Sequence, residues 1–153
     1  MFDDLADAIA EARVPVDRRA VVEAIRLNDR LGAKVSEAVG QLDARLAAPG
    51  GRPADPTLAV WLRRQARLGY ADAERLVFTA QRLRHWPLTR RSWLDGVLSG
   101  SQVNAVVANV PPGATLRYAA EESEVVPVLI GLSVTDTAAA LRRWLAGHPP
   151  NGT

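Results

Sequence analysis

Apolar residues recur every three or four positions along most of this chain, the spacing that places them on one face of an α-helix. No segment shows the two-residue alternation of a half-buried strand. We expect helices over residues 3–12, 18–48, 57–67, from the turn at 68–69 to about 85, and over 88–98, 100–110, 114–124 and 137–146. The sequence therefore predicts an all-α bundle of about seven or eight helices, with one long N-terminal helix and a helix-turn-helix-like central region.

The long helix, at about residues 18–48, carries a heptad pattern. Apolar or small residues alternate at spacings of four and three, at Val21, Ile25, Asn28, Gly32, Val35, Val39, Leu42 and Leu46. At about 1.5 Å per residue this helix is roughly 45 Å long. Two interpretations remain open: the helix packs along the rest of its own domain, or it pairs with a second copy as a coiled coil in which polar Asn28 fixes the register.

Capping and turn residues set the expected boundaries. Asp17 is expected to cap the long helix, Ser99 and Gln102 form a capping box, and Ser133 with Asp136 gives a further cap signal. The Pro- and Gly-rich stretch at 49–56 predicts a flexible loop, and residues 147–153 predict a linker-like tail. Residues 1–146 are expected to form a single helical domain, because a chain of 153 residues fits one core of ordinary size.

Composition excludes several classes of protein. The chain has no Cys, so neither a disulfide framework nor a thiolate metal site is possible. Its first residues are acidic where a signal peptide is basic, and no apolar run reaches the roughly 18 residues of a membrane span. We therefore expect a soluble, cytoplasmic protein without a membrane partner.

Charge is distributed unevenly along the chain. Between Arg63 and Arg91 there are eight arginines and two acids, a balance of +6 in a chain whose net charge is +2. In the helix at 57–67, Leu58, Trp61, Leu62 and Gln65 share one face and Arg63, Arg64 and Arg67 lie on the other. In the next helix Ala73, Leu76, Ala80 and Leu83 form the core face, opposite Arg75, Phe78, Arg82 and His85. A basic stripe with an aromatic residue in it suits a nucleic-acid backbone.

A further pair of arginines lies in the first turn of the helix at 88–98, where the helix dipole disfavours positive charge. A bound anion would offset this cost. The predicted nucleic-acid contacts are thus Arg63, Arg64, Arg67, Arg75, Arg82, His85, Arg90 and Arg91. The alternative is a solvated arginine face, with Phe78 packed against Trp86 or Trp93.

Two helix pairs have the length of a helix-turn-helix unit. One turns at Leu68-Gly69-Tyr70, and the other at Leu98-Ser99-Gly100. If the second pair docks on DNA, the polar groups that could meet base edges are Ser101, Asn104 and Asn109; if the first pair docks, they are Arg75, Arg82 and His85.

The sequence offers little for catalysis. Its two histidines, His85 and His148, are isolated, and Glu121, Glu122 and Glu124 are expected to form a charged helix face. We expect no metal, no cofactor and no enzymatic activity of this chain alone.

The order Trp61-Leu62, Leu68-Gly69, Ala73-Glu74, Trp86-Pro87, Leu98-Ser99 and Gln102-Val103 resembles the N-terminal helical domain of the actinobacterial HNH-endonuclease-like proteins, the thirteen-E-twelve repeat family. The resemblance covers nearly the whole chain. It implies a helical domain of undefined role that precedes a nuclease module. No positions here match the nuclease residues, because two histidines and no cysteine cannot supply an HNH site.

Together, these features lead us to expect a non-catalytic DNA-binding or targeting module associated with an HNH-type nuclease. The alternative is a protein-interaction or dimerisation module built on the long helix. DNA is the expected partner, and a second copy of this chain is the other possibility.

Overall fold

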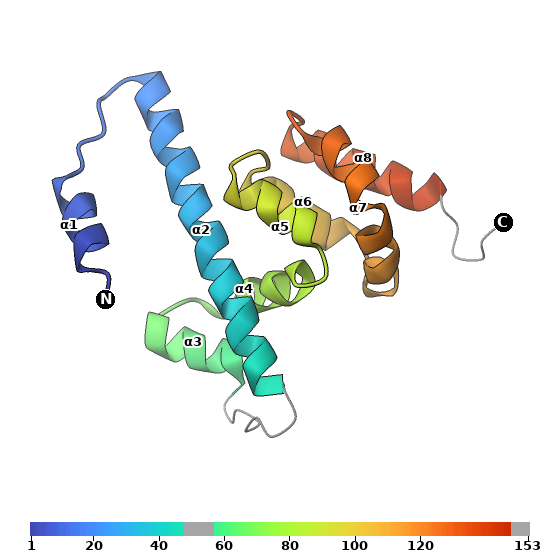
Figure 1. The fold of residues 1–153 in the computed structure, drawn as a ribbon, viewed down its shortest axis with the longest axis horizontal. Helices are drawn as coiled ribbons and strands as arrows, with labels where there is room; N and C mark the ends of the chain where they lie inside the picture. Colours follow the sequence, from blue (N-terminus) through green and yellow to red (C-terminus); the bar gives the residue numbers. More distant parts are fainter. Residues whose placement is uncertain (48–56, 148–153) are drawn as a thin grey trace.

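The chain folds into an all-α assembly of eight helices and one 3-10 turn over the residues that the structure describes, 1–47 and 57–147 (Figure 1). This structure is a computed structural model. Its elements are α1 (Asp3–Glu11), α2 (Arg18–Ala47), α3 (Leu58–Ala66), α4 (Tyr70–Leu83), α5 (Pro87–Leu94), α6 (Gly100–Asn109), η1 (Pro112–Ala114), α7 (Thr115–Leu129) and α8 (Val134–Gly147). The predicted all-α bundle with one long helix is confirmed. The predicted loop at 49–56 and residues 148–153 of the predicted tail lie outside the described residues.

Three predicted capping signals are confirmed by their hydrogen bonds. The Ala20 amide donates to Asp17 Oδ1 at 2.8 Å at the start of α2. The Ser99–Gln102 capping box is complete at α6, with both reciprocal bonds formed. The Asp136 amide donates to Ser133 Oγ at 3.0 Å, although α8 begins at Val134, three residues before the predicted start. Each signal works because its two groups are only three residues apart.

One predicted boundary is wrong, and one helix runs on through a proline. Helix α5 ends at Leu94 and not at Leu98, because Gly96 takes a φ of 78° and the chain turns back so that the Val97 and Leu98 amides donate to the Ser92 carbonyl. Helix α7 continues through Pro127 to Leu129. Pro127 is exposed, so the carbonyl that loses its helical donor lies on the solvent side.

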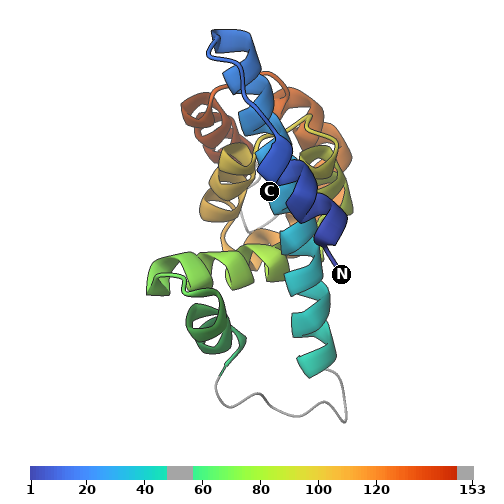
Figure 2. The same ribbon diagram turned by 90° about the vertical axis from the view of Figure 1, so that its left-hand side faces the viewer.

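The buried apolar residues form two clusters. The larger is built mainly from α4 to α8 and surrounds Trp86 and Tyr118, whose ring centroids are 4.5 Å apart. The smaller joins the carboxy-terminal half of α2 to α3 and α4 around Val39, Leu58 and Val77. Helix α2 crosses the assembly and contacts α4, α5 and α6 (Figure 2).

The face of α2 that packs on the domain is not the predicted heptad seam. Its buried residues are Ala33, Ser36, Val39 and Gly40, and only Val39 belongs to the seam. A Cβ atom on Gly40 would meet the Ala80 carbonyl oxygen at 3.1 Å, so small residues allow α2 and α4 to approach closely. The carboxy-terminal half of α2 therefore follows the first of the two interpretations, packing within its own domain.

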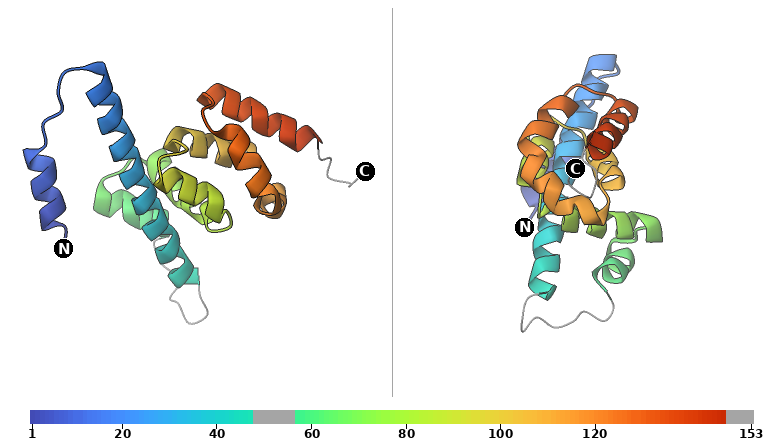
Figure 3. Two further views of the ribbon diagram at one scale, coloured as in Figure 1. Left: turned by 45° about the horizontal axis from the view of Figure 1, so that its top comes forward. Right: turned by 90° about the vertical axis from the view of Figure 1, so that its right-hand side faces the viewer.

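The amino-terminal arm, which we define as residues 1–26, has no such packing. The domain begins to hold α2 at Asp29, which accepts the Gly100 amide at 2.8 Å, and at Arg30, which donates to the Leu94 carbonyl at 3.0 Å. No residue before Ala33 is buried, and α1 buries none of its residues. The predicted amphipathic helix at 3–12 is present as α1, yet its apolar residues Leu5 and Ile9 are exposed. Figures 1 and 3 show α1 standing apart from α2, to which an extended segment joins it.

Candidate nucleic-acid interface

The most basic exposed part of the predicted site is the corner where α3 turns into α4. Thr57 begins α3 by accepting the Val60 amide with its side chain, and Leu58 and Ala59 anchor the helix in the smaller cluster. Arg64 and Arg67 are exposed, and Arg63 is half-buried. From Trp61 to Ala71 the sequence contains no acidic residue. The α3–α4 corner, which we define as Trp61, Arg63, Arg64, Arg67 and Tyr70, is therefore basic and aromatic. An acid, Asp72, lies close by in space, with its Oδ2 3.6 Å from the Cβ position of Gly69.

Two aromatic side chains of this corner face solvent. Trp61 is 45% exposed and Tyr70 is 63% exposed, and the Arg63 guanidinium lies over the Tyr70 ring with its Cζ atom 5.7 Å from the centroid. The sequence places Trp61 on the same helix face as Leu58 and Leu62, yet Trp61 does not share their cluster. The smaller cluster takes up only Leu58, Ala59 and Leu62 from α3, so Trp61 lies beyond its edge.

Arg67 has an unusual backbone conformation. It ends α3 with a φ of 56° and a ψ of 41°, and it is the one non-glycine residue with positive φ among those described. Glycine is the common residue at this left-handed position, because any Cβ atom there is strained by about 1 kcal/mol. Sequence inspection missed this feature, since a left-handed arginine leaves no mark in the sequence.

Arg82 is not part of any exposed surface, and its predicted outward position is wrong. Its residue is only 7% exposed, and its Nη2 donates to the Val110 carbonyl at 2.7 Å. Its guanidinium lies over the rings of Trp86 and Phe78, at 4.7 and 5.5 Å from their centroids. Burial lowers the pKa of Arg82 below that of a free guanidinium. The Phe78 ring thus lies against the Arg82 guanidinium.

The other predicted contacts on α4 are exposed. Arg75 pairs with Asp72 at 3.7 Å, and both side chains are largely in solvent. His85 is exposed just after the end of α4. Arg84, which was not predicted as a contact, donates to the Gly40 carbonyl and pairs with Asp43, so it fastens α4 to α2.

Arg90 and Arg91 lie on α5, whose positive amino terminus is satisfied from within the chain. The buried carboxylate of Glu122 accepts the Leu88 amide at 3.0 Å and the Thr89 amide at 2.7 Å. No external anion is therefore needed to offset the helix dipole. The prediction that Glu122 belongs to a charged solvent face is wrong, whereas Glu124 is exposed as expected.

Tyr118 belongs to the same buried network. Its hydroxyl lies 2.8 Å from Thr89 Oγ1, and burial together with the nearby Glu122 carboxylate raises the pKa of Tyr118 far above its usual value. The phenol is neutral over the physiological range. This network joins α5 to α7 and plays a structural role.

The second helix pair, α5 and α6, offers little surface to DNA. Six of the ten residues of α6 are buried, Val103 and Val106 completely. Of the three predicted base-edge contacts, Ser101 and Asn104 are exposed, and Asn109 donates its side-chain amide to the Ala105 carbonyl. Helix α6 is therefore a core helix, and the pair α3 and α4 is the better candidate for contact.

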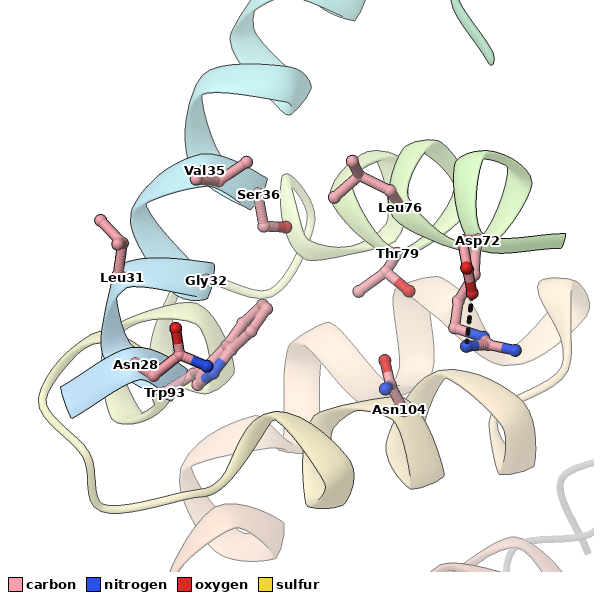
Figure 4. A pocket seen from close by; sticks show the side chains of 11 residues that line it. Asn28, Leu31, Gly32, Val35, Ser36, Asp72, Leu76, Thr79, Trp93 and Asn104 are labelled. Atoms are coloured by element: carbon pink, nitrogen blue, oxygen red, sulfur yellow. Dashed lines mark ion pairs between the residues drawn. The ribbon is translucent and has the colours of Figure 1, made fainter. Parts of the chain in front are cut away.

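A cavity of about 420 Å³ opens between α2, α4 and α6 (Figure 4). Leu31, Val35, Leu76 and Trp93 form its apolar wall, and Ser36 and Thr79 lie where α2 faces α4. The hydroxyls of Ser36 and Thr79 are buried and have no hydrogen-bond partner among the described residues. The ionisable residues that line the cavity are Asp72 and Arg75, which pair with each other at 3.7 Å.

The described residues contain no group of three or more His, Cys, Asp or Glu side chains placed to hold a metal ion. None of the helices seen in residues 1–47 and 57–147 combines the length and hydropathy of a membrane span. Comparisons of the chain with models of protein families, with curated proteins and with solved structures found no match.

Proposed function

We propose that this chain is a nucleic-acid-binding module that contacts the phosphate backbone through the α3–α4 corner, with Arg63, Arg64 and Arg67 on phosphates. The observation that carries the proposal is the grouping of exposed arginines and exposed aromatic rings at this corner, without an acid among them. Backbone charge supplies most of the affinity of a non-specific complex, and exposed aromatic rings can stack on unpaired bases.

The left-handed arginine gives independent support. Strained residues of this kind persist where the surrounding structure over-determines them, and they cluster at binding and active sites. Glycine would fit the backbone of Arg67 better, so the presence of a charged side chain there is explained if that side chain contacts a ligand. In this proposal any strand cleavage belongs to a separate nuclease module, as in the family that the sequence resembles.

The test uses a matched pair of double variants. Arg64→Ala with Arg67→Gly removes two charges from the corner, and Arg142→Ala with Arg143→Ala removes two exposed charges from α8. Figure 1 places α8 at the far side of the assembly from α3. Fluorescence anisotropy with labelled single-stranded and duplex oligonucleotides, measured over a range of salt concentrations, reports the affinity of each variant.

We expect the corner variant to bind several-fold more weakly and its slope of log affinity against log salt to fall by about 2. The α8 variant should retain the affinity of the unmodified chain. Equal losses in both variants would show a diffuse charge effect without a site. Absence of binding at low salt would contradict the proposal altogether.

A further substitution separates backbone contact from stacking. Trp61→Ala should weaken binding to the single strand by about 1 to 3 kcal/mol and leave duplex binding nearly unchanged, because only unpaired bases can stack on the indole. If duplex and single strand lose affinity equally, Trp61 does not stack on bases. The affinity would then come from the contacts of the arginines with the phosphate backbone.

A further inference from the structure

The amino-terminal arm leaves apolar side chains of two helices exposed in one chain. On α1 these are Leu5 and Ile9, 42% and 61% exposed, and on α2 they include Val21, Val22 and Ile25, 43% to 62% exposed. Both helices are amphipathic, and neither arm surface is covered within the described chain. An amphipathic helix gains its stability in a protein from packing its apolar face, so each of these faces needs a counterpart.

The two surfaces have opposite charge. Helix α1 carries four acids and no base between Asp3 and Glu11. The first turns of α2 have a hollow lined by Arg18, Arg19, Val22, Glu23 and Arg26, which places three arginines around an exposed valine. The acidic apolar surface of α1 is thus complementary to the basic apolar surface of α2.

The spacing of the charges matches as well. Asp4 and Glu11 are seven residues apart, which places both on the same flank of the apolar face of α1. Arg19 and Arg26 are also seven residues apart and flank the apolar face of α2. Seven residues span about 10.5 Å on each helix, so both carboxylates can meet both guanidinium groups when the helices lie side by side.

We propose that two copies of this chain associate by exchanging α1, so that α1 of each copy packs on residues 18–26 of α2 in the other. Within one chain α1 leaves its apolar face exposed and stands away from α2 (Figures 1 and 3). A two-fold exchange forms the complementary contact twice, and it doubles the buried apolar area for the same pair of surfaces.

Charge reversal provides the test. The α1-reversed variant carries Asp4→Arg and Glu11→Arg, and the α2-reversed variant carries Arg19→Glu and Arg26→Glu. In a pair of α1-reversed copies the substituted positions 4 and 11 are basic and meet the basic Arg19 and Arg26. In a pair of α2-reversed copies the acidic Asp4 and Glu11 meet acidic residues at positions 19 and 26. Each variant alone should be monomeric by sedimentation velocity at concentrations where the unmodified protein is a dimer.

An equimolar mixture of the two variants should dimerise again. In that mixture the reversed positions 4 and 11 of the first variant meet the reversed positions 19 and 26 of the second. The unmodified α1 of the second variant meets the unmodified α2 of the first, so both contacts pair opposite charges. Because α1 buries nothing in a single copy, these substitutions leave the core intact, and circular dichroism verifies the fold.

A matched control uses exposed apolar residues elsewhere. Leu5→Asp with Ile9→Asp should abolish the dimer, whereas Leu116→Asp with Val128→Asp on α7, at residues 77% and 59% exposed, should leave it unchanged. A mixture of the two charge-reversed variants that stays monomeric would overturn the exchange and indicate that α1 folds back on its own copy. An unmodified protein that is monomeric at every concentration would overturn self-association and indicate a different protein as partner.

Discussion

The amino-terminal arm and the α4–α8 core are both built from amphipathic helices, yet they differ in whether each apolar face finds a counterpart. In the core, Trp86, Val103 and Leu141 are essentially inaccessible to solvent. In the arm, Leu5, Ile9 and Ile25 have the same helical spacing and remain exposed. Periodicity therefore identifies a face that is able to pack, and the number of complementary faces within the chain decides whether it does so. The arm has two such faces, on α1 and on residues 18–26 of α2, and the domain covers neither of them.

The largest expected effect concerns the core, at the carboxylate that caps α5. Glu122→Ala leaves the Leu88 and Thr89 amides without their buried acceptor and should lower the free energy of unfolding by about 3 kcal/mol. Glu124→Ala, an exposed glutamate on the same helix, should change it by less than about 0.5 kcal/mol. Urea denaturation measures both, and equal effects would mean that the Glu122 cap contributes nothing.

The next effect distinguishes the two arginines of α4. Arg82→Ala removes the bond to the Val110 carbonyl and the packing on Trp86, and should destabilise the fold by about 2 kcal/mol. Arg75→Ala removes only an exposed ion pair, which contributes at most about 1 kcal/mol. A larger loss for Arg75 than for Arg82 in thermal unfolding would contradict the buried role of Arg82.

Alkaline pH should weaken the core through Tyr118. Its folded pKa is raised, so the native state keeps the proton while the unfolded tyrosine releases it near pH 10. The contribution of Tyr118 to the free energy of unfolding is therefore fully present below about pH 10. Above that pH it should fall by up to about 1.4 kcal/mol per pH unit.

The two tyrosines of this chain allow a direct comparison. Tyr118→Phe should flatten the decline of the urea midpoint above about pH 10, at a loss of about 1 kcal/mol for the bond to Thr89. Tyr70→Phe should leave the decline in place, because Tyr70 is 63% exposed. If the urea midpoint of Tyr118→Phe declines with pH as steeply as that of the unmodified chain, a group other than Tyr118 causes the decline.

The smallest effect is expected in the arm. Ile25→Ser, at a residue that is 62% exposed, should change the free energy of unfolding of the dilute chain by less than about 0.5 kcal/mol. At high protein concentration the same substitution should lower the melting temperature relative to the unmodified chain, since the proposed dimer stabilises the folded state by mass action. A large loss in dilute solution would mean that Ile25 packs within its own chain.

The helix starts could be predicted because their signals are local. The Ser99–Gln102 capping box and the Asp17 cap join groups three residues apart, so a single turn of helix already contains the whole interaction. The core face of α4 follows from periodicity for the same reason, and Ala73, Ala80 and Leu83 are buried. Of the candidate site, the sequence identified the arginines at positions 63, 64 and 67 and their basic surroundings.

The residue at which α5 ends and the exposure of Trp61 could not be predicted from local signals. Helix α5 stops where Gly96 turns the chain back towards Ser92. The apolar periodicity of the sequence gives no sign of that turn. Trp61 has the spacing of a core residue, but the cluster beneath α3 is small and ends before it. In both cases the pattern was compatible with two outcomes, and packing selected one.

The sequence by itself determined the all-α class, the long helix, its caps and the concentration of positive charge, because all of these depend on neighbours within one or two turns. Only the tertiary structure decided which charges are available to a partner. Arg82 is buried where it donates to the carbonyl of a residue 28 positions away. Glu122 is buried where it accepts hydrogen bonds from amides 33 and 34 positions away. The physical reason is that a buried charge needs a hydrogen-bond partner, and where that partner lies depends on how the helices pack.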